Sequence, residues 1–178
     1  AHKAEFYEFY RAKMLSPDAQ PNAAHRKLAQ WEAEGKLKAV ITQNIDGLHQ
    51  KAGSREVLEL HGSVLRNYCE RCHKFYGLDV ILHSTGVPKC SCGGDIKPDV
   101  VLYEEGLDED VMGRALRYIH DADMLIIGGT SLVVYPAAGL VRYYRGRKLV
   151  VINKGTVGAD IGADLVIDGP IGHVLAQV

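Results

Sequence analysis

Apolar positions at helical spacing open the chain. They predict a helix over residues 4–15 with one buried face: Phe6, Tyr7, Phe9, Tyr10 and Met14. A second helix follows a polar break, with Pro21 in its first turn and Gly35 as its stop. Ala24, Leu28 and Trp31 mark the buried face of this second helix. Packing in a hydrophobic core accounts for both faces.

Short apolar runs bounded by polar turns predict strands further along the chain. The strands are expected at 39–42, 57–60, 124–127, 149–152 and 165–167. Helices are expected over 108–120, after Pro136 and from Ile171. Strands that alternate with helices predict an α/β domain whose mainly parallel sheet has helices on both faces.

All four cysteines lie in one short segment between the predicted strands. Cys69 and Cys72 are two residues apart, and Cys90 and Cys92 are one residue apart. Paired thiolates on tight turns are typical of a tetrahedral zinc site, and four of them leave no coordination position for water or substrate. Structural zinc is therefore predicted, with reduced thiols or disulfides as the alternatives and His73 as a possible substitute ligand.

Composition narrows the functional classes. The 178 residues carry 21 basic and 22 acidic side chains, so no general electrostatic attraction to nucleic acid or membrane is expected. A nucleic-acid-binding zinc ribbon is disfavoured for the same reason. No apolar run approaches the roughly 20 residues of a membrane span. A soluble, cytoplasmic protein is the expectation.

Polar residues follow several of the predicted strands. They form four groups: Thr42 to Gly47, His61-Gly62, Gly128 to Ser131, and Asn153-Lys154. Ligands of open parallel sheets bind beyond the carboxyl ends of the strands, so the four groups predict a shared site. Helix caps and tight turns are the alternative explanation of each group alone.

Together these segments resemble the sirtuin family, in its bacterial type. TQNIDGLH at 42–49 matches the family's asparagine–aspartate motif, and Leu60-His61-Gly62 matches its catalytic histidine motif. The cysteine segment stands where sirtuins carry zinc. KPDVVLYEE at 97–105 resembles the substrate loop, and the segments 129–131 and 151–153 resemble two cofactor motifs.

The resemblance implies a Rossmann-like NAD-binding domain over 1–63 and 99–178, with a zinc-binding insert at 64–98. It also implies an NAD+-dependent deacylase that acts on acyl-lysine proteins or peptides. In that reaction the acyl oxygen attacks the ribose and expels nicotinamide, and the acyl group ends on ADP-ribose. NAD+ and the peptide would meet in a cleft, and neither nucleic acid nor membrane would be a partner.

Roles follow from the same resemblance. His61 would be the general base that takes a proton from the ribose, which suits an imidazole near pH 7. Asn44 and Asp46 would join it in catalysis, positioning ribose, water and the nicotinamide amide. The residues expected to hold NAD+ are Gln43, Asn44, Asp46, Gly129, Thr130, Ser131, Asn153 and Ile171. Val101, Leu102 and Val133 would bind the acyl-lysine peptide, and the zinc ligands would be Cys69, Cys72, Cys90 and Cys92.

The chain departs from the family pattern in two places. Glu104 stands where the family usually has glycine, which is expected to change peptide preference without blocking the chemistry. The family's opening strand and its Gly-Ala-Gly-Ile-Ser phosphate loop have no counterpart in the sequence. A catalytically incomplete fragment that only binds acyl-peptides through a zinc-containing module is therefore the alternative.

Overall fold

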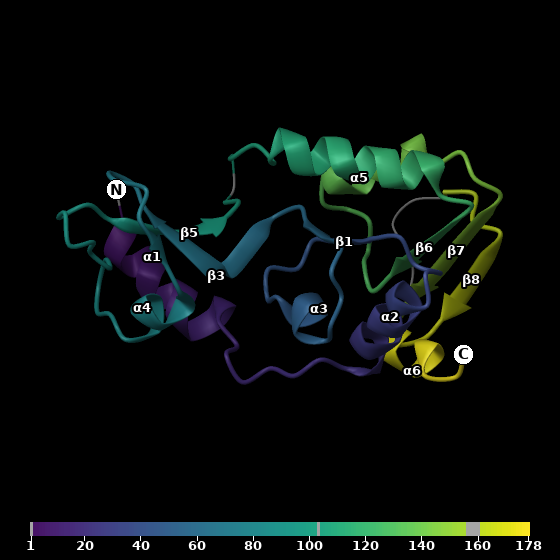
Figure 1. Cartoon of the computed structure of the whole chain (residues 1–178), viewed down its shortest axis with the longest axis horizontal. Helices are drawn as coiled ribbons and strands as arrows, with labels where there is room; N and C mark the ends of the chain where they lie inside the picture. Colours follow the sequence, from purple (N-terminus) through teal and green to yellow (C-terminus); the bar gives the residue numbers. More distant parts are fainter. Residues whose placement is uncertain (1, 103, 156–160) are drawn as a thin grey trace. The chain divides into compact units, whose positions relative to one another are not determined.

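A computed structural model describes residues 2–102, 104–155 and 161–178, and divides the chain into two compact units (Figure 1). The first, called the cysteine unit, holds Ala1–Ala19, Asn44–Gly47 and His61–Gly106. The second, called the parallel-strand unit, holds Gln20–Gln43, Leu48–Leu60 and Leu107–Val178. Each is described by itself.

The cysteine unit is built on a small antiparallel sheet. Its strands are β4 (Phe75–Tyr76), β3 (Gly62–Cys69) and β5 (Ile96–Val100), hydrogen-bonded in that order. Three helical segments accompany them: α1 (Lys3–Phe9), the π-helical turn η1 (Tyr10–Met14) that continues it, and α4 (Leu78–Leu82). The predicted N-terminal helix is thus confirmed, with a π-helical second half, but Phe9, which was expected on its buried face, is 57% exposed.

Two tyrosines explain why the N-terminal helix belongs with the cysteine segment. Tyr7 and Tyr10 are buried, and they form one hydrophobic cluster with Ile81, Ile96 and Cys69. The Tyr7 hydroxyl also donates a hydrogen bond to the carbonyl of Ile96. The cysteine unit therefore extends beyond the predicted insert. It adds these ranges to 64–98: 2–19, 44–47, 61–63 and 99–106.

The parallel-strand unit contains two parallel sheets. One is the pair β1 (Val40–Thr42) and β2 (Val57–Glu59). The other has the order β6 (Met124–Gly128), β7 (Lys148–Asn153) and β8 (Leu165–Asp168). Its helices are α2 (Ala23–Ala33), α3 (Leu48–Lys51), α5 (Glu109–Asp121), the 3-10 helix η2 (Ala137–Tyr143) and α6 (Ile171–Leu175).

Successive side chains of β6 and β7 point to opposite faces of the sheet, and both faces are covered. On one face Ile127 and Val151 pack with Ala138 of η2. On the other face Ile152 packs with Ala24 and Leu28 of α2 and with Leu175 of α6. The predicted parallel α/β architecture with helices on both faces is confirmed, and so is the buried face of the second helix.

The ends of α2 show how local sequence sets the boundaries. The Asn22 side chain accepts a hydrogen bond from the backbone N–H of His25, and the His25 ring accepts one from the backbone N–H of Asn22. This capping box makes Asn22 the N-cap, so Pro21 precedes the helix and the prediction that it lies in the first turn was wrong. Gly35 follows the last turn with a φ of 74°, as expected of a helix stop. No helix in the described part of the chain is long and apolar enough to cross a membrane.

The two buried tyrosines of the N-terminal helix should respond oppositely to loss of the hydroxyl. Tyr7→Phe removes the donor to the Ile96 carbonyl and should lower the free energy of unfolding by about 1 kcal/mol. The Tyr10 hydroxyl is buried and has no hydrogen-bond partner among the described residues, so Tyr10→Phe should leave stability unchanged or raise it by up to about 1 kcal/mol. Urea unfolding of both variants measures the difference. Equal losses for both would contradict the packing described.

Candidate active site and metal centre

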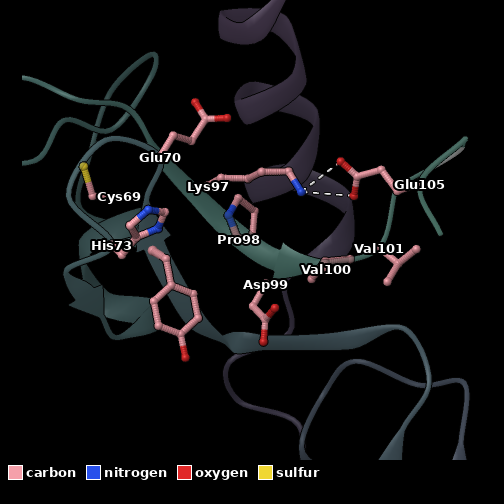
Figure 2. Close-up of a pocket in the computed structure, with 10 residues that line it drawn as sticks. Cys69, Glu70, His73, Lys97, Pro98, Asp99, Val100, Val101 and Glu105 are labelled. Atoms are coloured by element: carbon pink, nitrogen blue, oxygen red, sulfur yellow. Dashed lines mark hydrogen bonds and ion pairs between the residues drawn. The ribbon is translucent and has the colours of Figure 1, made fainter. Parts of the chain in front are cut away.

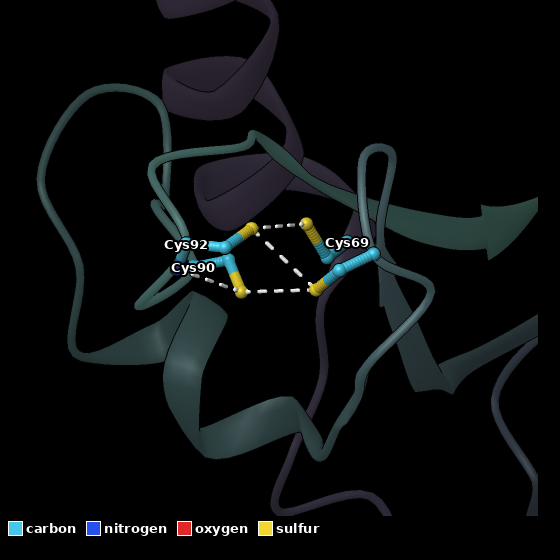
Figure 3. A group of neighbouring side chains, drawn as sticks. Cys69, Cys90 and Cys92 are labelled. Atoms are coloured by element: carbon cyan, nitrogen blue, oxygen red, sulfur yellow. Dashed lines mark hydrogen bonds between the residues drawn. The ribbon is translucent and has the colours of Figure 1, made fainter.

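The four cysteines converge at the C-terminal end of β3, where Cys69 is the last residue of the strand (Figure 3). The Sγ atoms of Cys69 and Cys92 are 3.5 Å apart, those of Cys72 and Cys90 are 3.6 Å apart, and those of Cys72 and Cys92 are 3.5 Å apart. All four lie within 4.8 Å of one another. A tetrahedron with Zn–S bonds of about 2.3 Å has sulfur separations of about 3.8 Å, so the cluster fits one zinc ion.

Neighbouring donors favour the thiolate form, which a metal requires, at one of these cysteines, Cys90. The backbone N–H of Cys92 points at Sγ of Cys90, and the Tyr76 hydroxyl donates to the same sulfur at 3.0 Å. These two hydrogen bonds, the backbone one first, lower the pKa of Cys90 to about 5. The four cysteines therefore form a potential zinc-binding site. His73 does not belong to the cluster found among the described residues.

His61 stands immediately before β3, at the opposite end of that strand from Cys69. Its backbone carbonyl accepts a hydrogen bond from the Val101 N–H at 3.0 Å, and in the register Gly62 pairs with Val100. Gly62 has a φ of 76°, and a Cβ there would lie 2.0 Å from the carbonyl oxygen of Asp99. Glycine is thus required after His61, because β5 passes too close for any side chain.

The asparagine–aspartate segment is held beside the same strand. The carbonyl of Ile45 accepts a hydrogen bond from the N–H of Val64 at 2.9 Å. Asn44 and Asp46 flank Ile45 and belong to the cysteine unit together with His61. Gln43 directly follows β1 and belongs to the parallel-strand unit. The structure thus groups His61 with Asn44, Asp46, Val101 and Leu102.

A second group of predicted residues lies at the carboxyl ends of the parallel strands. Gly128 ends β6 in register with Ile152 of β7, and the Gly129 N–H donates to the Ile152 carbonyl at 3.0 Å. A Cβ on Gly128 would lie 2.1 Å from Cδ1 of Ile171, so α6 packs directly on this turn. Asn153 ends β7 beside it. This arrangement brings Gly129, Ile171 and Asn153 to one edge of the sheet, where open α/β sheets bind nucleotides.

The rest of that turn is exposed and partly strained. The Thr130 hydroxyl oxygen accepts from the Leu132 N–H at 3.1 Å, and Leu132 is buried with a φ of 54°. Ser131 is exposed, and Val133 is 59% exposed. Val133 thus offers its side chain to solvent, next to the turn.

Sequence reasoning did not identify the hollow in the outward face of β3 and β5 (Figure 2). Its volume is about 260 Å³. The residues that line it are Tyr68, Cys69, Glu70, His73, Lys97, Pro98, Asp99, Val100, Val101 and Glu105. The signal that could have revealed it is the period-two spacing of 68 and 70, at and just beyond the end of β3, and of 97, 99 and 101, in and just beyond β5.

A match to a protein-family model identifies the family of this chain. The Sir2 family model matches residues 1–136 of the chain. The chain belongs to the Sir2 family. The predicted sirtuin resemblance is confirmed.

Relatives within the family agree with this placement. An NAD-dependent protein deacetylase of Clostridium perfringens is 63% identical over 176 residues, which cover 98% of this chain and 72% of that protein. One of Staphylococcus aureus is 46% identical over 162 residues, covering 91% of this chain and 67% of that protein.

Solved structures of Sir2 proteins share the fold. A Sir2 complex with a p53 peptide and NAD+ has a TM-score of 0.91 at 43% identity, covering 99% of this chain and 77% of that one. A Sir2 complex with the inhibitor EX-527, 2'-O-acetyl-ADP-ribose and a deacetylated p53 peptide has a TM-score of 0.91 at 41% identity. It covers 99% of this chain and 79% of that one.

The metal assignment gives a testable prediction. The purified protein should contain about one zinc ion per chain, and Cys69→Ser should lose it. Loss should destabilise the protein by several kcal/mol, because binding energy at a structural zinc site is folding energy. Elemental analysis and thermal unfolding measure the two effects.

Ser91→Ala is the matched control, since Ser91 lies between two ligands and is not one of them. It should keep both zinc and stability. Wild-type protein without zinc, or Cys69→Ser with its zinc intact, would exclude the site.

Proposed function

We propose that the protein is an NAD+-dependent protein-lysine deacetylase. It transfers the acyl group of an acyl-lysine to ADP-ribose and releases nicotinamide. The observation that carries the proposal is the backbone hydrogen bond between His61 and Val101, which joins the catalytic histidine motif to the substrate loop. The relatives of Clostridium perfringens and Staphylococcus aureus, which are NAD-dependent protein deacetylases, support the same reaction.

His61 acts as the general base. An unprotonated imidazole nitrogen takes the proton from a ribose hydroxyl of NAD+, which prepares that oxygen to attack the acyl carbon. The backbone carbonyl of His61 is occupied by Val101, and Gly62 fixes the chain just after it. These contacts hold the histidine's backbone, so the side chain approaches the ribose from a defined position.

The substrate loop binds the acylated peptide. The Val101 N–H is used by His61, which leaves the Val101 carbonyl to accept the amide N–H of the acyl-lysine side chain. Leu102 packs on the lysine stem. Val133 contributes main-chain hydrogen bonds to the peptide as an added strand, and its exposure supports this role.

NAD+ serves as the co-substrate and supplies the ribose carbon that accepts the acyl oxygen. In the cysteine unit, Asn44 positions the ribose and a water, and Asp46 binds the nicotinamide amide. In the parallel-strand unit, Gln43 and the strand ends bind the dinucleotide: Gly129, Thr130, Ser131, Asn153 and Ile171. The exposed turn after Gly128 supports this assignment, because backbone there can approach a ribose or phosphate closely.

Zinc has a structural role in this proposal. Cys69, Cys72, Cys90 and Cys92 would fill its coordination shell, so the ion would hold the turns and would take no part in acyl transfer. We also propose a cytoplasmic location. The four free thiols support it, since such clusters persist in reducing compartments.

His61→Ala tests the general base. The variant should lose about 10²- to 10⁴-fold in turnover, the usual contribution of a positioned base. Mass spectrometry of nicotinamide and O-acetyl-ADP-ribose, formed from NAD+ and an acetyl-lysine peptide, gives the rates. Circular dichroism and zinc content should stay at wild-type values.

His83→Ala is the control, because His83 is an exposed histidine of the same unit. It should keep full activity. Unchanged turnover in His61→Ala would show that the base is another group. Peptide binding without any turnover in the wild type would instead favour the acyl-peptide binding module.

A further inference from the structure

Glu104 has a backbone conformation that side chains rarely adopt. Its φ is 73°, in the left-handed region that favours glycine. The residue lies in a turn of the substrate loop, closed by a hydrogen bond from the Glu105 N–H to the Leu102 carbonyl at 3.1 Å. The chain thus keeps a glutamate at a position where glycine would remove strain, and such outliers invite a functional explanation.

The neighbouring carboxylate already has a structural task. Glu105 accepts hydrogen bonds from the Leu102 N–H and from Lys97 Nζ, both at 3.0 Å. These donors, the backbone one first, lower the pKa of Glu105. Glu104 is exposed, and the described residues offer its carboxylate neither a hydrogen bond nor an ion pair. Glu105 therefore fixes the turn, and Glu104 presents its charge to solvent.

Carboxylates outnumber cations among the side chains that line the hollow beside the loop, and each carboxylate is held in an ion pair. Glu70, Asp99 and Glu105 line it against one cation, Lys97, which is held by Glu105 (Figure 2). Glu70 and Asp99 have partners of their own in Lys3 and Arg66, on partly exposed ion pairs. The ring of Tyr68 adds an aromatic surface on which a guanidinium can stack.

We propose that Glu104 makes the substrate loop selective for acyl-lysine peptides with a basic side chain, best an arginine, next to the acyl-lysine. The inference rests on the proposed function, in which the Val101 carbonyl binds the acyl-lysine three residues before Glu104. A peptide held there brings its flanking side chains to the turn. A planar guanidinium can pair with the Glu104 carboxylate through two hydrogen bonds and lie over the acidic hollow.

The size of the effect follows from the exposure of the pair. Surface ion pairs change an equilibrium by small factors, so a preference of about three- to fivefold is expected. The preference should fall in high salt, because the Debye length shrinks from about 10 Å at 0.1 M to about 3 Å at 1 M. Maximum turnover should change less than KM, since the contact is made equally before and during the reaction.

The test compares acetyl-lysine peptides that differ at one flanking position, carrying either arginine or its uncharged isostere citrulline. The wild type should favour arginine about three- to fivefold in kcat/KM and in peptide Kd. Glu104→Gln and Glu104→Gly should both bring the ratio close to one. Glu104→Gly should also unfold at a higher temperature, because glycine relieves the left-handed strain.

Glu8→Gln is the matched control, an exposed glutamate of the same unit without an ion pair among the described residues. It should keep the wild-type ratio. A wild type that turns over both peptides equally, or a Glu104→Gln variant with the full preference, would overturn the inference while leaving the deacetylase intact. No nicotinamide release from either peptide would instead refute the proposed function, and the Kd ratio would still report on Glu104.

Discussion

The close pairing of β3 with β5 is the constraint on which the cysteine unit depends. The ladder joins Gly62 to Val100 at one end and Cys69 to Ile96 at the other, a span of roughly 20 Å. The hydrogen bond between His61 and Val101 continues the ladder beyond Gly62 and Val100. The candidate zinc ligands begin at the other end, with Cys69. A side chain at position 62 would collide with Asp99, so the whole ladder requires that glycine.

This geometry explains how a metal without open coordination positions can matter to chemistry far from it. Zinc would fix the turns that end β3 and begin β5, and the ladder then sets where His61 and Val101 stand. The aromatic face of α1 and η1 supports the same ladder from its apolar side, through Tyr7 on the Ile96 carbonyl. Loss of the metal should therefore disturb the register of β3 against β5, and with it the positions of His61 and Val101.

Sequence patterns predicted the elements well wherever one local rule sufficed. β6 and β7 follow from short apolar runs bounded by polar turns, and the cysteine cluster follows from its spacing. The extent of the cysteine unit did not follow, because it depends on tertiary packing of Tyr7 and Tyr10 against residues some 70 to 90 positions later. The hollow also escaped prediction, since its lining joins two strands whose register only the fold determines. Pro21 was misplaced because Asn22 offered a better cap.

Residues with a left-handed backbone conformation lie in or next to the turns to which a function is proposed. The non-glycine residues with positive φ in the described part of the chain are His73, Glu104 and Leu132. His73 directly follows a cysteine of the candidate zinc site, Glu104 lies in the proposed substrate loop, and Leu132 directly follows the proposed dinucleotide turn. Each left-handed residue costs about 1 to 2 kcal/mol, which the surrounding contacts must offset. For Leu132 burial in the sheet core supplies that compensation, and for His73 its N–H bonds the Cys69 carbonyl. For Glu104, the turn is closed by the Glu105 N–H on the Leu102 carbonyl, but its own side chain is exposed and has no hydrogen bond or ion pair among the described residues, so the proposal assigns its role to that side chain.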